Sequence, residues 1–491
     1  MRFIKKHKFW FVLVGAALIS FALCLVLAAG QQLWFDESYS VVVAKKPLGD
    51  IISLTSVDAH PPFYYLLLHF WGGLVSWNEL GLRALSIAFY SASIGLMLLF
   101  ISKLFSKKTA LYSAPILVLA PFLLRYGFEV RMYSLASLVT VGSCFALWYA
   151  LKTGRNRYWV LYGLLVTLGV WTLYMTFIVF AAQFILLLAR TIKRRGKWLK
   201  QKWLLVYAGA IALYIPWIPT ALHQMTGGAL SGANVTFGIN QLINVPSFGL
   251  IYTTSDQLDF IYWLLLVTVL AAIVVTAINV TKKKLVDSKK LLFLSMHFLI
   301  PLALFMIIAS PIFGWKIYLE RYLAQLIIFG YASLAVVFSA LAFANKAKPR
   351  YSAYIAIVLV VLVGTANLFE AGNFNYQRLD RPANRDIAKT LSQYCDQSIV
   401  VDDLYVYTEL APYMADNCHY YFSSPGEVDY NGGYAPLHGS DRRIAKPSSI
   451  NTKQLVVVTE KDQASFVPNS KYTKLSSQKT TSRNLSVYTR N

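Results

Sequence analysis

The sequence predicts a polytopic α-helical membrane protein with about eleven transmembrane helices, followed by a small C-terminal extracytoplasmic α/β domain. Of its 491 residues, 57% are hydrophobic and 14% are charged, whereas soluble domains carry about 25% charged residues. Apolar runs of about 20 residues, the length that crosses about 30 Å of hydrocarbon, recur as far as residue 369. After residue 370 the composition becomes polar. Together these observations exclude an ordinary soluble protein.

Eleven apolar runs define the predicted spans. They lie at residues 9–30, 83–105, 110–127, 132–151, 157–173, 174–192, 203–220, 259–281, 291–310, 322–343 and 351–369. The predicted domains are therefore a transmembrane domain, 1–369, with an external loop at 31–82, and a C-terminal domain, 370–491.

The basic residues are distributed unevenly between the connecting segments. Six segments hold 25 of the 46 lysines and arginines: residues 2–8, 103–108, 152–157, 190–202, 282–290 and 346–350. They alternate with connections that carry few cations, which is the positive-inside pattern of membrane proteins. The pattern predicts an integral protein of the plasma (inner) membrane with a cytoplasmic N-terminus and an extracytoplasmic C-terminal domain. The net charge of +23 is then a topology signal, with the lipid bilayer as partner and no nucleic acid.

The carboxylates show the opposite distribution. Nine of the ten before residue 370 lie in segments predicted to face outward: Asp36, Glu37, Asp50, Asp58, Glu79, Glu129, Asp256, Asp259 and Glu320, with Asp287 as the exception. Acidic residues contribute little to membrane orientation, so this placement needs another cause. An ionisable side chain kept at a membrane is costly and indicates function. We expect a working site at the outer face.

The C-terminal domain alternates predicted helices and strands. Helices are expected over 384–394 and 405–414, and strands over 398–403, 454–459 and 485–489. This alternation is typical of a small α/β domain. Cys395 and Cys418 lie here, where an oxidising compartment permits a disulfide, and the sequence leaves their pairing open.

The first candidate site follows the first span directly. Trp34-Phe35 is suited to the membrane interface, and Asp36-Glu37 comes next. Transfer of a glycosyl group to a hydroxyl needs a base for the acceptor proton, and partial desolvation raises the pKa of a carboxylate and makes it a stronger base. The alternative is a pair of carboxylates that solvates the end of a helix.

The second candidate is the motif at residues 58–62, Asp-Ala-His-Pro-Pro, in the same external loop. Two prolines restrict the backbone there and favour the start of a helix over 63–77. Asp58 is a further catalytic candidate, His60 is suited to a donor phosphate or to Asp58, and Tyr64 is placed to line the site. The alternative is a capping aspartate with an interfacial histidine.

Two further motifs begin later spans on the predicted outer side. Glu129-Val130-Arg131-Met132-Tyr133 opens the fourth run, and Arg321-Tyr322 opens the tenth. Arginine offers phosphate a planar fork of donors, so Arg131 and Arg321 are candidates for binding a phosphate. Glu129 and Arg131 are two residues apart, and on a helix they would face different partners. The alternative is an arginine that snorkels at the membrane boundary.

These motifs together resemble the GT-C glycosyltransferases, most closely the branch of protein O-mannosyltransferases and lipid A aminoarabinose transferases. The resemblance covers about residues 1–370 and implies a GT-C-like fold. It makes Asp36 the catalytic base, because the first acidic residue of this loop has that role in the branch. It also implies functional roles for Glu129 and for the Arg321-Tyr322 pair. Residues 173–177 lack a histidine that many bacterial relatives carry, which leaves the donor sugar open.

The resulting hypothesis is an inverting glycosyltransferase. It would move a hexose or pentose from a polyprenyl-phosphate-linked donor to a hydroxyl of a protein, lipid or glycan acceptor at the outer face. No cofactor is required and no metal site is predicted, although a divalent cation is left open. The alternative hypothesis is a transporter or flippase for a lipid-linked sugar, which predicts helices broken near the middle of the membrane.

Overall fold

The computed structural model describes residues 2–29, 31–194, 201–226, 236–253, 260–312, 317–343, 348–370, 384–429, 432–446, 450–460, 470–479 and 483–491. Asp256 and Asp259, the segment 195–200 and the residues that follow Glu370 at the predicted domain boundary lie outside this description. The chain packs as two compact units. The first unit is Met1–Leu27 with Arg83–Ala371, and the second unit is Ala28–Leu82 with Gly372–Asn491.

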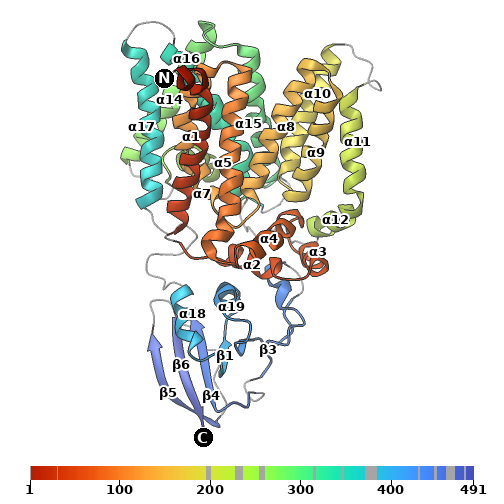
Figure 1. Ribbon diagram of the computed structural model, residues 1–491, viewed down its shortest axis with the longest axis vertical. Coiled ribbons are helices and arrows are strands. Elements are labelled where there is room, and N and C mark those ends of the chain that lie inside the picture. Colours follow the sequence, from red (N-terminus) through yellow and green to blue (C-terminus); the bar gives the residue numbers. More distant parts are fainter. Residues whose placement is uncertain are drawn as a thin grey trace. The chain divides into compact units, whose positions relative to one another are not determined.

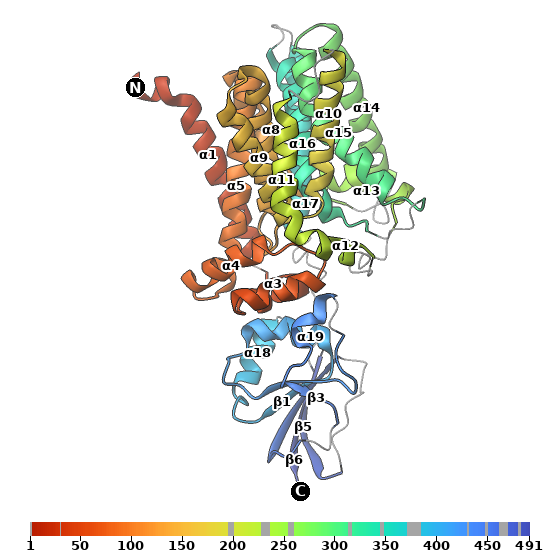
Figure 2. The same cartoon turned by 90° about the vertical axis from the view of Figure 1, so that its right-hand side faces the viewer.

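The first unit is a helical bundle whose long helices lie side by side (Figures 1 and 2). Its helices are α1 (Arg2–Ala29), α5 (Glu79–Leu104), α6 (Lys107–Val118), α7 (Pro121–Gly127), α8 (Tyr133–Thr153), α9 (Asn156–Thr172), α10 (Thr176–Lys193), α11 (Lys202–Tyr214), η2 (Ile215–Trp217), α12 (Ile218–Thr226), α13 (Ile239–Leu250), α14 (Phe260–Lys282), α15 (Ser288–Ile308), η4 (Glu320–Leu323), α16 (Ala324–Phe343) and α17 (Lys348–Glu370). Within the described residues, each of the eleven predicted runs is helical. The helix α13 was not predicted.

Nine helices of the described residues are long and apolar enough to cross a membrane, and a tenth candidate is the bent pair of α6 and α7. That pair turns by 65° at a short break, and Pro121 begins α7 after it. The predicted run 157–173 corresponds to α9, which has 17 residues. The polytopic membrane fold is therefore confirmed.

Local signals explain several helix ends. Ser106 caps α6, since its side chain accepts a hydrogen bond from the Thr109 backbone N–H at 3.0 Å. Asp287 caps α15 by accepting from Lys289 N at 3.0 Å and Lys290 N at 3.3 Å. Gly154 ends α8 at φ 69°, a left-handed conformation that glycine adopts without a side-chain clash.

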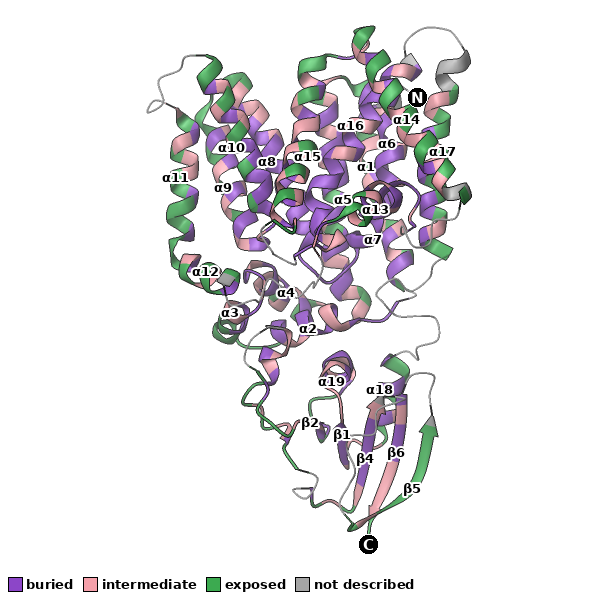
Figure 3. Cartoon of the chain, turned by 180° about the vertical axis from the view of Figure 1, so that it is seen from behind, coloured by how far each residue is buried: buried purple, intermediate pink, exposed green. Residues whose placement is uncertain are grey.

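The bundle has buried helices at its centre and exposed helix faces on its outside (Figure 3). In the α16 span 83% of the residues are buried, whereas in Lys202–Met225 only 17% are. The exposed side chains of α11 nevertheless include Leu205 and Ile211, at 76% and 57% exposure. Large apolar patches on a helix surface fit a lipid environment and not water.

The second unit combines the predicted external loop with the C-terminal domain. The loop forms α2 (Phe35–Ala44), α3 (Leu48–Val57) and α4 (Phe63–Leu74), so the predicted helix after the prolines is present. The C-terminal domain contains α18 (Asn384–Ser392), β1 (Ser398–Val401), α19 (Leu404–Leu410), η5 (Ala411–Tyr413), β2 (Tyr420–Ser423), η6 (Gly432–Leu437), β3 (Arg443–Ile444), β4 (Gln454–Glu460), β5 (Tyr472–Lys479) and β6 (Arg483–Arg490).

The sheet has the order β3-β2-β1-β4-β6-β5. The first four strands are parallel, with Ile399 opposite Tyr420 on one side and Val456 on the other. β6 pairs antiparallel with both β4 and β5. All four residues of β1 are buried, as expected for a central parallel strand covered on both faces.

The core of this domain packs against both faces of the sheet. Ile399 and Val401 face α18 and α19, and Val400 and Val457 face the opposite side. Cys395 and Cys418 form a disulfide with a Cα–Cα distance of 4.3 Å, which decides the pairing that the sequence left open. It links the segment before β1 to the segment before β2.

Candidate functional site

The helices of the external loop place the first candidate carboxylates on the first turn of α2. Asp36 is half-buried, and Glu37 is fully buried. Glu37 Oε2 accepts a hydrogen bond from the Trp34 backbone N–H at 3.4 Å, and the Asp36 carbonyl accepts from Ser40 Oγ at 2.8 Å. Acidic side chains at a helix N-terminus are stabilised by the helix dipole. Glu37 therefore helps to form the first turn that presents Asp36.

Asp58 and His60 lie between α3 and α4 and are both buried, at 7% and 5% exposure. The Tyr65 hydroxyl donates to Asp58 Oδ2 at 3.5 Å. Tyr65 packs edge-to-face on Tyr64, and also on Tyr39 of α2 with ring centroids 6.3 Å apart. The aromatic contacts thus bring Asp58 and Tyr64 into one cluster with the helix that carries Asp36.

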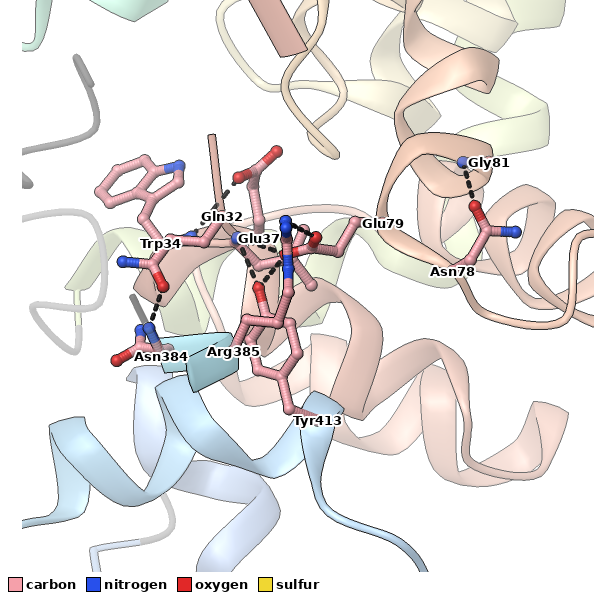
Figure 4. A network of polar contacts seen from close by, with 10 residues as sticks. Gln32, Trp34, Glu37, Asn78, Glu79, Gly81, Asn384, Arg385 and Tyr413 are labelled. Carbon is pink, nitrogen blue, oxygen red and sulfur yellow. Dashed lines mark hydrogen bonds and ion pairs between the residues drawn. The ribbon is translucent and has the colours of Figure 1, made fainter. Parts of the chain in front are cut away.

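The C-terminal domain holds this loop through a polar network (Figure 4). Tyr413 Oη accepts from the Leu33 backbone N–H at 2.8 Å and donates to Glu79 Oε1. Arg385 of α18 forms an ion pair with Glu79 Oε2. Glu79 therefore binds both the start of the loop and two elements of the C-terminal domain. None of these roles was predicted, because partners about 300 residues apart leave no local pattern.

A second set of contacts joins α2 to α19. The ring of Phe35 stacks on Tyr405, with centroids 4.5 Å apart and planes 6° from parallel. Ser38 Oγ donates to the Glu409 carbonyl at 3.3 Å. The Glu409 side chain is buried and accepts from Arg483 Nη2 of β6 at 2.7 Å. The helix that carries Asp36 is therefore packed on an element that is itself tied to the sheet.

In the first unit, the segment before α8 gathers charged side chains. Arg125 Nη1 and Glu129 Oε1 form an ion pair at 2.7 Å, and both side chains are buried. Arg131 is also buried, and its backbone N–H donates to the Glu129 carbonyl at 2.6 Å. Glu129 and Arg131 lie in a bend and not on a helix, since α8 begins at Tyr133. The spacing argument for a helix therefore does not apply to this pair, and Arg125 is a partner of Glu129.

Two residues of α5 join this segment. Arg83 is fully buried, with its guanidinium carbon 5.7 Å from the centroid of the Phe128 ring. One turn later, Ser86 Oγ donates to the Arg131 carbonyl at 3.4 Å. Three buried arginines, Arg83, Arg125 and Arg131, therefore lie in or against this segment of the first unit. Such a cluster of fork-shaped donors is suited to an anion such as phosphate.

The Arg321-Tyr322 pair lies in η4, at the start of α16. Gln325 Nε2 donates to the Tyr322 carbonyl at 2.7 Å, and Thr140 Oγ1 of α8 donates to the Gln325 carbonyl at 3.0 Å. Tyr133 packs edge-to-face on Tyr126, with centroids 6.0 Å apart. The structure thus ties η4 to α8, the helix that follows Glu129 and Arg131.

The candidate residues form two groups, one in each unit. Asp36, Glu37, Asp58, His60 and Tyr64 lie in the second unit, and Glu129, Arg131, Tyr133, Arg321 and Tyr322 lie in the first. Within the described residues, no three His, Cys, Asp or Glu side chains are grouped as metal ligands would be.

Comparison with known proteins supports the predicted resemblance. Residues 59–221 match the family described as dolichyl-phosphate-mannose-protein mannosyltransferase. No curated protein sequence matches the chain. The matched stretch contains His60, Tyr64, Glu129, Arg131 and Tyr133.

Among solved structures, ArnT from Cupriavidus metallidurans in the apo state aligns over 98% of both chains, with a TM-score of 0.63 and 13% identity. The same protein bound to undecaprenyl phosphate aligns over 98% of both chains, with a TM-score of 0.62 and 13% identity. The predicted GT-C-like fold is confirmed: this chain has a fold like that of ArnT, and its residues 59–221 match the mannosyltransferase family model.

Proposed function

We propose that this protein is an inverting membrane glycosyltransferase that uses a polyprenyl-phosphate-linked sugar. The match of residues 59–221 to the mannosyltransferase family carries the proposal, because it includes the candidates His60, Glu129 and Arg131. The fold shared with ArnT, which binds undecaprenyl phosphate, supports a polyprenyl donor.

In this mechanism Asp36 takes the proton of an acceptor hydroxyl. The acceptor oxygen then bonds to the anomeric carbon of the donor sugar, and the bond from that carbon to the phosphate oxygen breaks. Attack from the face opposite to the phosphate inverts the anomeric centre. Glu37 and Asp58 position the acceptor and Asp36, and Tyr64 lines their cluster.

The lipid phosphate leaves with additional negative charge. Arg131 and Arg321 bind it, and His60 donates a further hydrogen bond. Preorganised cationic donors stabilise charge that develops in a transition state, and removal of one such donor costs about 100- to 1,000-fold in rate. Glu129 fixes Arg125 through their buried ion pair and so shapes the arginine cluster.

We place the reaction at the outer face of the plasma membrane, with the N-terminus in the cytoplasm and the C-terminal domain outside. The alternation of basic connecting segments supports this orientation. Single cysteines introduced at Asp396 and Lys108 test it. A membrane-impermeant maleimide should label the first position in intact cells and the second only after lysis.

The decisive experiment measures release of free polyprenyl phosphate by the purified protein from a panel of lipid-linked hexoses and pentoses. Protein, lipid and glycan acceptors are tested in turn. The wild type should release lipid phosphate only with a suitable acceptor, and Asp36→Asn should not. Asp50→Asn is the matched control, since it removes an exposed carboxylate from α3 of the same loop. Equal turnover by Asp36→Asn and Asp50→Asn would refute the role of Asp36.

Metal dependence is tested in the same assay. The mechanism assigns the phosphate charge to arginines, so turnover should continue in EDTA. Loss of turnover in EDTA, with recovery on addition of Mg²⁺ or Mn²⁺, would place a divalent cation at the donor phosphate.

The transporter hypothesis remains as the second candidate because the bundle contains a broken helix. The pair α6 and α7 bends by 65°, and broken spans are typical of transporters. Movement of a fluorescent lipid-linked sugar across proteoliposomes, without release of lipid phosphate for any acceptor, would favour that function.

A further inference from the structure

The second unit contains a cavity of about 240 Å³ between the end of α2 and the C-terminal domain. Val42 and Lys46 line it from the first part of the unit, and residues within 407–420, 433–437 and 440–442 line it from the C-terminal domain. Val42 is six residues after Asp36 on the same helix, which corresponds to about 9 Å along its axis. None of the candidate catalytic residues lines this cavity.

The floor of the cavity is apolar and aromatic. Tyr407 and Tyr420 both line it, and their rings stack with centroids 4.4 Å apart and planes 9° from parallel. Met414 and Leu437 are buried beside them. Burial raises the pKa of Tyr407 to about 12, so its phenol keeps its proton and stays a donor. Aromatic and apolar side chains in the lining of a small cavity fit the apolar face of a ring-shaped ligand.

The lining of the cavity also carries four charged side chains, namely Lys46, Arg442, Asp416 and Asp441. Arg442 is held in place, since its Nη1 donates to the Cys418 carbonyl at 2.6 Å and its Nη2 to the Asp416 carbonyl at 3.2 Å. Two cations and two carboxylates give no excess of either sign. A phosphate site needs an excess of positive charge, so this wall favours a neutral ligand with both donors and acceptors.

The cavity is also coupled to the first turn of α2. Gly433 lines it, and a Cβ placed on this glycine would lie 3.3 Å from the ring of Phe35. Phe35 directly precedes Asp36 and stacks on Tyr405. A ligand in the cavity therefore contacts elements that pack on the turn that presents Asp36.

We propose that this cavity binds one neutral sugar residue. Pockets for drug-sized ligands have volumes of about 300–1,000 Å³, so the smaller cavity here fits a single ring. Hydroxyl groups donate to Asp416 and Asp441 and accept from Lys46 and Tyr407, and the apolar face of the ring lies over the tyrosines. This inference rests on the proposed function, in which the sugar belongs to a glycan acceptor or to the lipid-linked donor.

The test measures direct binding, so it does not depend on turnover. The full chain is reconstituted in lipid nanodiscs, because maltoside detergents are themselves sugars. Saturation-transfer NMR is recorded with mannose, glucose, galactose, arabinose and N-acetylglucosamine, and with glucuronate and glycerol 3-phosphate as anions. A neutral sugar should bind to the wild type and equally to Asp36→Asn. Binding of only the anions, or of no probe, would overturn the proposal.

Two variants locate the binding. Asp441→Asn should weaken the sugar about tenfold, since it removes a hydrogen bond to a charged group. Lys46→Gln should also weaken sugar binding, and it replaces Asp441→Asn in the test if that variant does not fold. Asp386→Asn, on the exposed side of α18, is the control. Equal affinity in Asp441→Asn, Lys46→Gln and the control would refute the assignment to this cavity.

Turnover then distinguishes the source of the sugar. If the cavity holds the acceptor, Asp441→Asn raises KM for a glycan acceptor and leaves KM for the donor unchanged. If it holds the donor sugar, the reverse is expected. A protein that binds sugar here but shows no turnover would contradict the proposed function and leave this inference intact.

Discussion

Among the residues that the structure describes, a buried pair of arginine and glutamate occurs in each unit, and the two pairs have different origins. Arg125 and Glu129 are four residues apart, whereas Arg483 and Glu409 are 74 residues apart. Both have N–O distances of 2.7 Å, and all four side chains are at most 5% exposed. The first pair lies among the candidate phosphate ligands, and the second lies between β6 and α19. The two pairs therefore have the same geometry, but we expect the first to act in phosphate binding and the second to stabilise the C-terminal domain.

Replacement of each pair by apolar residues should separate the two roles, because well-packed apolar residues often substitute for a buried ion pair without loss of stability. Arg125→Met/Glu129→Leu should lower turnover at least about 100-fold, since it disrupts the arginine cluster that binds the leaving phosphate. The measurement is release of lipid phosphate at saturating donor. Arg483→Met/Glu409→Leu is the matched control and should keep wild-type turnover. A comparable loss of turnover in both double variants would contradict the different roles of the two pairs.

Removal of one partner from the Arg483–Glu409 pair should have the next largest effect, which is on the stability of the C-terminal domain. Arg483→Met alone leaves the buried Glu409 carboxylate without this partner, which costs about 3–5 kcal/mol. The backbone amides of β4 and β6 in the full chain should then exchange hydrogen faster, by the factor that corresponds to this loss of stability. The double variant with Glu409→Leu should restore most of the protection. Full protection in Arg483→Met would show that the pair contributes little.

The Glu79 network extends the comparison to an ion pair that is partly exposed. Glu79→Gln replaces a carboxylate that accepts from Tyr413 and Arg385, and hydrogen bonds to charged groups contribute about 1.5–3 kcal/mol each when buried. Arg385 is 55% exposed, so its share is smaller. Hydrogen exchange over residues 31–44 should increase, with the C-terminal sheet unaffected. Asp386→Asn provides the control. An unchanged exchange rate in Glu79→Gln would show that the Glu79 network does not hold the loop on the C-terminal domain.

The smallest effect is expected at Glu427, on the surface. The Gly439 backbone N–H, followed by Arg443, lowers the pKa of this carboxyl below its usual value. A depressed pKa stabilises the folded state above the unfolded pKa, and this contribution disappears as the pH falls through the folded pKa. Glu427→Gln should therefore lower the melting temperature slightly at pH 7 and by less at about pH 3, below the unfolded pKa of about 4.3. An equal difference at both values would exclude an electrostatic cause.

Much of the fold was predictable because the signals are local. A span is recognised by its own apolar length, and the eleven predicted runs are helical where the structure describes them. In the C-terminal domain, α18, β1 and β4 were predicted from local periodicity. β5 was missed because its eight residues, YTKLSSQK, form an edge strand with little apolar content. β2 and β3 are only four and two residues long.

Candidate site residues could be proposed from the sequence only where they lie within a short motif. Asp36, Asp58 and Glu129 stand in recognisable local patterns. Glu79, Arg385 and Tyr413 gave no comparable signal, because each becomes significant only through its partners. The cavity between α2 and the C-terminal domain was equally hidden, since its walls come from residues 42–46 and 407–442.

The sequence by itself determined the succession of apolar helices, the alternation of basic segments and the candidate motifs, because these depend on neighbours within a few turns, whereas its eleven predicted spans correspond to nine or ten helices of sufficient length in the described residues. Only the tertiary structure decided that the external loop packs with the C-terminal domain, that β1 lies between β2 and β4, and that Glu409 pairs with Arg483. The physical reason is that a long-range contact forms when two surfaces are complementary in shape and charge. That property belongs to the folded pair and to neither segment alone.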